Sequence, residues 1–342
     1  MKRLIMATAL LALVGVLVVQ QLQQRWEAPL AIPAGGLELV VESGDSLRAI
    51  AAELHAAGVV DNPLLLRAYG RWTGLDQQIK RGEYRLPGPL TAEQLLHVLV
   101  DGNVISYQVT LPEGITLQQA LAMLSKAEAL ESEVQGIADA RLRALAGERP
   151  SAEGLFLPES YHYERGDSDW DILQRAHAAL NRVLAEAWQQ RMDNLPYESP
   201  YEALIMASII ERETGVPEER REIAGVFVRR LQRRMRLQTD PTIIYGLGES
   251  FDGNLRRVHL NDPNNIYNTY RHHGLPPTPI ALPGRAAIEA ALNPADGDSL
   301  FFVARGDGSH TFSSNLADHD RAVRQYQLQR RADYRSSPGG DQ

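Results

Sequence analysis

Apolar residues fill one early stretch of the chain almost without interruption, whereas elsewhere they mix with polar residues at helical or strand spacing. The uninterrupted run extends from Leu4 to Val19, follows two basic residues and ends at a group of glutamines. A bilayer core takes about 20 apolar residues, with about 17 as the lower limit. The pattern therefore predicts a transmembrane signal-anchor at residues 4–20, with residues 1–3 cytoplasmic because basic flanks stay inside. A cleaved signal peptide is the alternative.

A linker and a small mixed unit are predicted after this segment. Two prolines and a glycine pair within residues 21–37 are typical of a linker. Residues 38–104 then combine short strands, a Gly-Asp-Ser-Leu turn at 44–47 and helical spacing. This order resembles the LysM-like module, and the resemblance implies binding of N-acetylglucosamine polymers.

The Gly-Asp-Ser-Leu string also matches the nucleophile block of GDSL hydrolases. It recurs at 297–300 in a different context, and a serine nucleophile needs a His and an Asp brought beside it. We therefore interpret Ser46 as the cap of the helix that follows it.

The rest of the chain predicts a larger catalytic domain at residues 105–333 and a disordered tail at 334–342, which is rich in Ser, Pro and Gly. Strands and helices are irregularly interspersed there rather than in steady alternation. The fold class is therefore α+β, with helices packed on a mixed or antiparallel sheet.

Composition narrows the possible functions. The 342 residues include 35 Lys and Arg against 43 Asp and Glu, a formal net charge of −8, which argues against a nucleic-acid partner. The absence of cysteine excludes disulfides, thiol catalysis and Cys-ligated metals. The 9 histidines show no spacing such as His-Glu-x-x-His, so no metal site is predicted.

One helix is predicted to carry the chemistry. Ser199 followed by Pro200 marks its start, with Glu202 placed to complete a capping box. Residues 203–210 are apolar on all sides, which predicts burial. The Gly-Val-Pro string at 215–217 marks its end.

Two glutamates, Glu211 and Glu213, fall in the last turn of this helix. They point to different sides, because successive residues are about 100° apart. The negative end of the helix dipole and apolar surroundings raise the pKa of a carboxyl group. A glutamic acid still protonated near neutral pH suits general acid catalysis. From this pattern alone, pairing of both with nearby arginines is the alternative.

Ordered motifs follow in the second half of the chain. They are Leu-Gln-Thr-Asp-Pro-Thr-Ile-Ile-Tyr-Gly at 237–246, Tyr-Asn-Thr-Tyr at 267–270, Gly-Leu-Pro-Pro at 274–277 and Gly-Ser-His-Thr-Phe at 308–312. The set resembles the endolytic murein transglycosylase family (MltG, formerly YceG-like) from about Gly154 to Leu316. The predicted anchor and LysM-like unit fit the layout of that family, and the segment around Glu153 resembles another part of its cleft.

The resemblance implies a cofactor-independent lyase acting on the glycan strands of peptidoglycan. Glu213, followed by Thr214, matches the acid of goose-type lysozymes and Slt-type transglycosylases, a Glu that precedes Ser or Thr at the end of the catalytic helix. Glu213 would protonate the oxygen of the MurNAc-β-1,4-GlcNAc bond. It would then accept a proton from the MurNAc 6-hydroxyl as that group attacks C1. The product is a 1,6-anhydroMurNAc end, and one carboxyl group does the work that ordinary glycosidases divide between two.

The other candidate site residues are polar or aromatic. Candidates that support the acid are Glu211, Asp240 and Tyr267. Hydroxyl and amide groups can hydrogen-bond sugars and tyrosine rings can stack on them, which gives eight substrate-binding candidates: Gln238, Thr239, Tyr245, Asn268, Thr269, Tyr270, His310 and Thr311. For each one, a packing or loop role is the alternative.

Two other functions remain open from the sequence. One is a non-catalytic peptidoglycan-binding scaffold, and the other is a hydrolytic muramidase, which uses water and leaves a reducing end. The resemblance also implies peptidoglycan synthases of the bacterial inner membrane as partners. The expected location is that membrane, with a single span, a cytoplasmic N-terminus and the bulk of the chain in the periplasm. There the enzyme would trim or terminate nascent strands.

Overall fold

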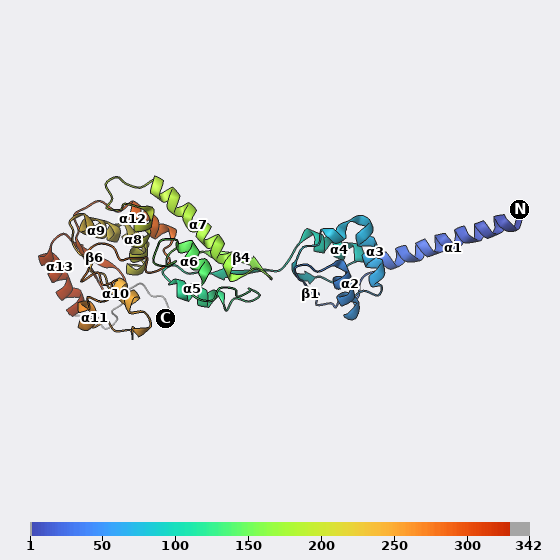
Figure 1. The fold of residues 1–342 in the computed structure, drawn as a ribbon, viewed down its shortest axis with the longest axis horizontal. Coiled ribbons are helices and arrows are strands. Elements are labelled where there is room, and N and C mark those ends of the chain that lie inside the picture. Colours follow the sequence, from blue (N-terminus) through green and yellow to red (C-terminus); the bar gives the residue numbers. More distant parts are fainter. Residues whose placement is uncertain (1, 329–342) are drawn as a thin grey trace. The chain divides into compact units, whose positions relative to one another are not determined.

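The computed structural model describes residues 2–328, which divide into two compact units (Figure 1). Unit 1 comprises the chain up to Tyr107 together with Glu128–Glu131 and His162–Asp167. Unit 2 comprises Gln108–Ala127, Ser132–Tyr161 and the chain from Ser168 onward. The predicted disordered tail, residues 334–342, lies outside the described residues.

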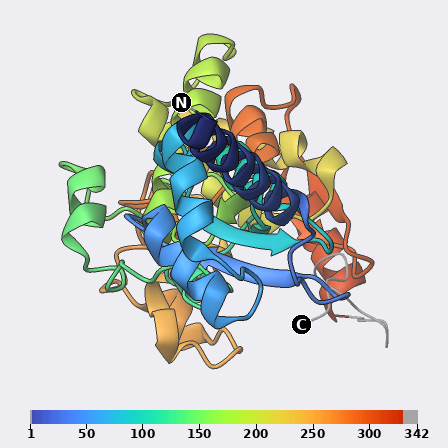
Figure 2. The ribbon, with the colours of Figure 1, turned by 90° about the vertical axis from the view of Figure 1, so that its right-hand side faces the viewer.

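Unit 1 begins with α1 (Lys2–Glu27), drawn in dark blue in Figure 2. In the part of the chain that the structure describes, no helix is both long and apolar enough to cross a membrane. The span predicted at residues 4–20 is therefore not confirmed. The helix continues through residues 21–27, which the sequence had assigned to the linker, because no glycine or proline lies between Gln21 and Pro29.

The rest of unit 1 packs three helices on a two-stranded antiparallel sheet. The elements are β1 (Leu37–Val41), α2 (Leu47–Ala56), α3 (Pro63–Thr73), the 3₁₀ turn η1 (Leu75–Gln77), β2 (Gly82–Leu86) and α4 (Ala92–Asp101). In the sheet Leu39 pairs with Tyr84, and both are buried with Ile50 and Leu95 in one core. Ser46 caps α2 by accepting from the Ala49 N–H. This contact confirms the interpretation of Ser46 as a helix cap.

Unit 2 is mostly helical. Its first half contains β3 (Ser106–Thr110), which begins in unit 1, then α5 (Leu117–Leu124), α6 (Ala140–Ala146), β4 (Ser160–Glu164), which ends in unit 1, and α7 (Asp169–Gln189). Its second half contains α8 (Pro200–Glu213), η2 (Pro217–Glu219), α9 (Arg220–Gln232), α10 (Asp240–Leu247), η3 (Gly248–Ser250), α11 (Arg257–Asn261), α12 (Arg285–Leu292), β5 (Phe301–Ala304), β6 (His310–Ser313), α13 (Leu316–Val323) and the π-helical turn η4 (Arg324–Leu328).

The expected mixture of helices and strands is present, but a single sheet beneath the helices is not. Within residues 2–328 the strands form three separate two-stranded sheets, β1–β2, β3–β4 and β5–β6. The helices of unit 2 therefore pack chiefly on one another, with α8 against α7, α9 and α12 (Figure 1).

Helix α8 is the centre of this packing. Every residue from Ala203 to Ile210 is buried, as the all-round apolar pattern predicted. Ser199 caps the helix by accepting from the Glu202 N–H. The capping box is not completed, because the Glu202 carboxylate accepts from the Glu198 N–H rather than from that of Ser199.

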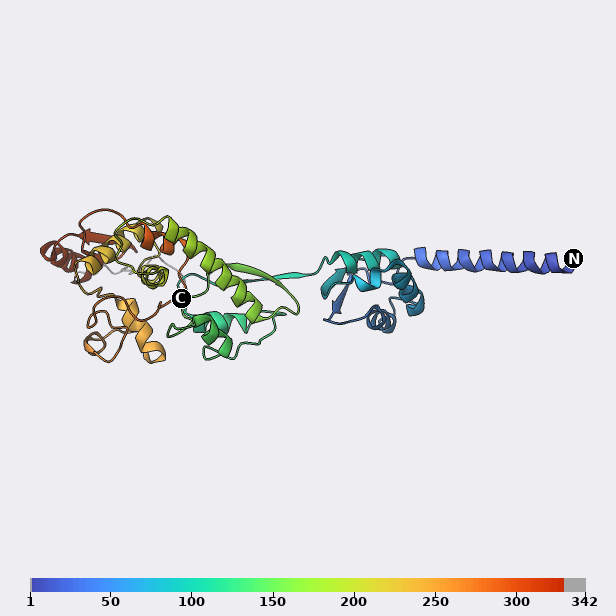
Figure 3. The same cartoon turned by 45° about the horizontal axis from the view of Figure 1, so that its top comes forward.

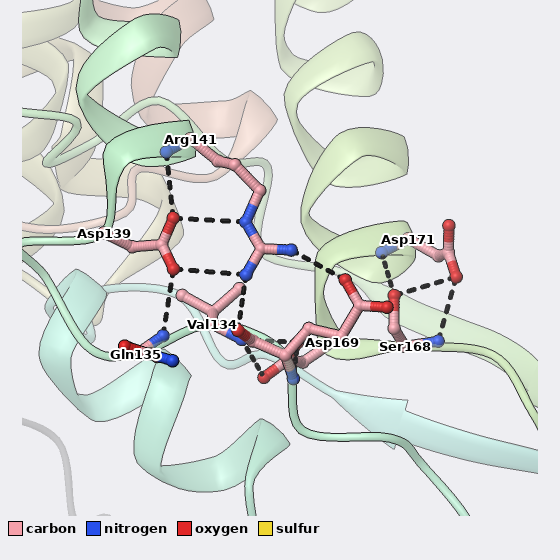
Figure 4. Close-up of polar contacts among 8 residues, drawn as sticks. Val134, Gln135, Asp139, Arg141, Ser168, Asp169 and Asp171 are labelled. Atoms are coloured by element: carbon pink, nitrogen blue, oxygen red, sulfur yellow. Dashed lines mark hydrogen bonds and ion pairs between the residues drawn. The ribbon is translucent and has the colours of Figure 1, made fainter.

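A polar cluster fixes the start of α6 beside the start of α7 (Figure 4). Asp139 caps α6 and accepts from Nε of Arg141 at 3.1 Å, and Arg141 also donates to Glu133. Asp169, in the first turn of α7, accepts from the backbone N–H groups of Glu133 and Val134. Arg141 beside Asp139 holds the pKa of that carboxyl group well below its usual range. These charge-assisted bonds set the direction in which α6 leaves the loop.

Candidate active site

Glu213 is the last residue of α8 and is held from one side only. The Thr239 hydroxyl donates to its Oε1 atom. Burial raises the pKa of Glu213 to about 7, the nearby Asp240 carboxylate adds to the rise, and Thr239 and Arg230 oppose it. Among the described residues no hydrogen bond reaches its Oε2 atom. One oxygen of this acid is therefore oriented by the protein and the other is free for a ligand.

Thr239 is itself fixed by a second buried threonine. Its backbone N–H donates to Oγ1 of Thr269 at 3.0 Å, and that atom lies 2.9 Å from Oγ1 of Thr242. The preceding residue, Gln238, has a φ of 54° and donates its N–H to the Thr269 carbonyl. The structure thus brings two of the sequence motifs together, and the buried hydroxyls of Thr239 and Thr269 serve to position the acid.

Arg230 supports the same segment and was missed by the sequence analysis. It is buried on α9, donates from Nε to the Leu300 carbonyl at 2.7 Å and from Nη1 to the Leu237 carbonyl at 2.9 Å. It also contacts the side-chain oxygen of Gln238 at 3.3 Å. Burial lowers the pKa of this guanidinium. A sequence signal existed, because position 230 lies one turn beyond the apolar Val226 on the buried face of α9.

Asp240 lies beside the acid, at the first position of α10. Asp240 begins this helix, and Pro241 follows it in the first turn. The Tyr270 hydroxyl donates to Oδ1 of Asp240 at 2.7 Å. Burial raises the pKa of Tyr270, and the Asp240 charge adds to the rise. Asp240 thus remains an exposed carboxylate close enough to Glu213 to raise the pKa of that group.

Glu211 faces away from Glu213, as the helical geometry predicted. Its Oε2 atom accepts from the Gly284 N–H at 2.9 Å, and its Oε1 atom lies 3.4 Å from Nη2 of Arg220. The side chain is buried, and burial raises its pKa. Because protein groups occupy both oxygens, Glu211 has the contacts of a structural partner of an arginine.

Tyr245 and Tyr267 connect the site to another buried glutamate, Glu153. The two tyrosine rings meet edge to face at 4.8 Å, and the Tyr267 hydroxyl lies 2.9 Å from that of Thr278. Tyr245 donates to Oε2 of Glu153 at 3.2 Å, and the Leu117 N–H donates to Oε1 at 2.9 Å. Glu153 is 6% exposed, and burial raises its pKa to about 7.

A cleft of about 1190 Å³ runs beside these groups. One wall comes from α5, α6 and the loop that ends at Glu153, and the other from α10, η3 and Tyr267. In Figure 3, α10 (gold) and the pair α5 and α6 (green) lie apart on these two sides. Glu213 does not itself line the cleft, but its neighbours Arg212 and Pro241 do. The cleft, which is large enough for a polymer segment, is thus lined by residues next to the acid rather than by the acid itself.

Two acids with a pKa of about 7 thus compete for the role of proton donor. Glu153 lines the cleft, but protein donors already occupy both of its oxygens. Glu213 has one oxygen without a protein partner among residues 2–328. A general acid needs an oxygen that reaches the substrate, so the geometry favours Glu213 and gives Glu153 a supporting position.

Asn268, predicted to bind sugar, lies in the interior of the protein. It has no exposed surface. Its Nδ2 atom donates to the carbonyls of His259, Leu260 and Asp262, and its Oδ1 atom accepts from the Tyr270 N–H. The amide is fully used in closing the loop that precedes Thr269.

His310 and Thr311 lie on β6 and are bound to other groups. Glu219 accepts from the His310 N–H at 2.8 Å and contacts its Nδ1 atom at 2.7 Å. Thr311 accepts from Nε of Arg305 at 2.6 Å. No hydrogen bond or ion pair joins either residue to Glu213 in the described part of the chain, so the structure does not bring them to the acid. That same part contains no group of three or more His, Asp or Glu side chains placed to hold a metal ion.

The buried Glu153 predicts a pH dependence of stability. Its pKa rises from 4.5 in the unfolded chain to about 7 in the fold, so the folded state keeps a proton that the unfolded chain releases. Stability then falls as pH rises from 4.5 to 7, by about 3 kcal/mol in total. Glu153→Gln keeps an acceptor for the Leu117 N–H and a partner for Tyr245.

Denaturant unfolding of wild type and Glu153→Gln at pH 4 and pH 8 measures this effect. We expect wild type to lose about 3 kcal/mol more than the variant between these two pH values. Glu213 titrates in both proteins, so its contribution cancels. Equal losses would show that Glu153 titrates normally in the fold.

Together these features define a protein with a single free acid beside an open cleft, an arrangement suited to general acid–base chemistry on an extended polymer. The chain belongs to the YceG-like family, which matches residues 39–325. The endolytic murein transglycosylase of Bacillus subtilis is 30% identical over 306 residues, covering 84% of this chain and 83% of that protein. The endolytic murein transglycosylase of Streptococcus pneumoniae is 29% identical over 320 residues, covering 84% of this chain and 57% of that protein.

A solved structure is also similar. A crystal structure of a YceG-like protein from Listeria monocytogenes is 27% identical and has a TM-score of 0.53. The match covers 84% of this chain and 99% of that one. The fold similarity thus extends well beyond the cleft.

Proposed function

We propose that this protein is an endolytic lytic transglycosylase that cleaves the MurNAc-β-1,4-GlcNAc bonds of peptidoglycan. The observation that carries the proposal is Glu213, an acid with a pKa of about 7, oriented by Thr239 and with one oxygen free beside a long cleft. Membership of the YceG-like family and the names of the relatives from Bacillus and Streptococcus support it.

Glu213 performs both proton transfers of the reaction. It first gives its proton to the glycosidic oxygen as the bond from MurNAc C1 to that oxygen breaks, and positive charge develops on the sugar. The ionised carboxylate then takes the proton of the MurNAc 6-hydroxyl while that oxygen bonds to C1. The acid returns to its starting state, and no water is consumed. A pKa of about 7 suits a group that must both give and take a proton near neutral pH.

The other groups of the site position the acid and stabilise charge. Thr239 fixes one carboxyl oxygen, so that proton transfer comes from the other. The Asp240 carboxyl group, exposed at the start of α10, lies where it can stabilise the developing positive charge on the sugar. General acid–base action of this kind contributes roughly 10²–10⁴-fold to the rate, and fixed charges and positioning supply the remainder.

The products of the reaction test the proposal. The full-length chain in detergent is incubated with purified peptidoglycan, and the fragments are analysed by mass spectrometry. We expect internal cuts that leave anhydro ends, one water lighter than hydrolytic ends. Reducing MurNAc ends would make the protein a muramidase, and an absence of cleavage with retained glycan binding would favour a scaffold.

We further propose that α1 anchors the chain in the bacterial inner membrane, with the bulk of the protein in the periplasm beside the peptidoglycan synthases. The apolar run from Leu4 to Val19 behind Lys2 and Arg3 supports this topology. The LysM-like resemblance of residues 38–104 supports glycan binding by unit 1. Membrane fractionation with alkaline carbonate tests the anchor: an integral protein stays in the pellet, whereas release into the supernatant would contradict the proposal.

A further inference from the structure

The cleft has a positive side in an otherwise acidic protein. Three arginines line it: Arg143 on α6, Arg149 in the loop after α6, and Arg212 next to the acid. Arg143 and Arg149 have no ion pair with any residue of the described chain. Arg212 uses Nη1 to donate to the Gly114 carbonyl at 3.0 Å. The chain as a whole has a net charge of −8, so a group of arginines without ion pairs differs from the rest of the protein.

The acidic groups of the cleft do not neutralise these arginines. Its lining contains two carboxyl groups, Glu153 and Glu249. Glu153 is buried, bonded at both oxygens and largely protonated below neutral pH. Glu249 accepts from the side-chain amide of Gln118 at 3.1 Å. Because three arginines face these two groups, the net charge of the lining is positive.

One arginine is held in place before any ligand arrives, and the helix that carries a second is fixed at its start. The guanidinium of Arg149 lies over the Tyr201 ring, 4.9 Å from its centre, an arrangement that orients the planar group. Arg143 stands on α6, whose start is fixed by the cluster of Asp139 and Arg141 (Figure 4). Gly147 ends α6 with a φ of 61°, a conformation that favours glycine. The turn leaves Arg149 lining the same cleft as Arg143.

We propose that Arg143, Arg149 and Arg212 bind carboxylates of the peptide stems that the glycan strand carries. Arginine is the side chain best suited to this ligand, because its planar group donates two parallel hydrogen bonds to one carboxylate. The stem leaves MurNAc, the same sugar whose C1 reacts at Glu213, and Arg212 is the neighbour of that acid. The protein would then select strands with intact acidic stems. This inference rests on the proposed function, which it makes more specific.

Cleavage of two matched substrates tests the inference. One is a preparation of glycan strands with their stems, and the other is the same preparation after an amidase has removed the stems. The full-length wild type is compared with the double variant Arg143→Gln/Arg149→Gln. We expect wild type to favour stem-bearing strands. The double variant should lose at least tenfold more kcat/KM on stem-bearing than on stem-free strands, mostly through KM.

A matched control separates this effect from the loss of charge. Arg182→Gln/Arg233→Gln removes two exposed arginines that do not line the cleft, and it should keep the wild-type preference. The preference of wild type should also weaken as salt is raised, because exposed charges are screened. If the cleft variant lost the same factor of kcat/KM on both substrates, or lost none on either, the inference would be overturned. The proposed function would remain intact.

Binding gives a readout that does not depend on turnover. In the Glu213→Gln background the strands stay intact, and co-sedimentation of the full-length chain reports affinity for each preparation. We expect tighter binding to stem-bearing strands, and loss of that difference in the cleft variant. An equal affinity for both preparations would contradict the inference. If wild type cuts neither preparation, the proposed reaction fails, and the binding difference still decides whether the cleft recognises stems.

Discussion

Glu213→Gln will reduce the formation of anhydro ends by about 10²–10⁴-fold. Glutamine keeps the size of the side chain and can still accept from the Thr239 hydroxyl, so the site should keep its shape. It cannot give a proton to the glycosidic oxygen or accept one from the 6-hydroxyl. Rates of anhydro-end formation by mass spectrometry, with thermal unfolding as a check on folding, measure the loss.

Glu211→Gln is the matched control, because it changes the other glutamate of the same helical turn. Its carboxylate is held by Gly284 and Arg220, so this variant should affect stability more than the chemical step. Loss of activity in Glu211→Gln with retention in Glu213→Gln would exchange the two roles. The pH profile adds a second check: with a pKa of about 7, the protonated fraction of Glu213 falls above pH 7 and approaches a tenfold loss for each further pH unit. The wild-type rate should fall with it.

Asn268→Ala will destabilise unit 2 by about 3 kcal/mol. The change removes four hydrogen bonds from a side chain with no exposed surface, three of them to the carbonyls of His259, Leu260 and Asp262. Each polar group left without a partner inside the protein costs about 1–3 kcal/mol, and some of the four will recover water. Chemical unfolding followed by circular dichroism measures the change.

Asn254→Ala is the control for this variant, since Asn254 is exposed in the same part of the chain. Exposed substitutions usually change stability by no more than about 0.5 kcal/mol. The sequence analysis had placed Asn268 among the sugar-binding residues. A raised KM in Asn268→Ala, with stability equal to that of Asn254→Ala, would restore that role and contradict the structural one.

The features that the sequence predicted best are those set by local rules. The start of α8 at Ser199 and Pro200, its burial and its end at Glu213 depend on capping, periodicity and turn residues within a few positions of one another. The cap at Ser46 and the strands β1 and β2 follow from similar local signals. Local rules also place Glu211 and Glu213 on different sides, because that separation depends only on helical geometry.

The parts that the sequence did not predict depend on contacts between distant segments. Glu153 and Tyr245 are 92 positions apart, and nothing in either local pattern indicates that one neutral carboxyl group will join α5 to α10. The assignment of Thr239 and Thr269 to sugar binding came from their residue type, whereas their burial depends on the packing of two loops. The extent of the predicted sheet was also not predicted, since short strands do not reveal their partners and here form only pairs.

The contact between Thr239 and Glu213 has a consequence for how the protein is made. The hydroxyl that orients the acid lies 26 residues after it, and the threonine that fixes this hydroxyl lies 30 residues further on. A chain is synthesised from its N-terminus, so α8 is complete before either partner exists. A nascent or truncated chain that ends after α9 carries the glutamate without the groups that hold it. The acid is therefore held in place only in a chain that extends at least to Thr269, more than three quarters of its length.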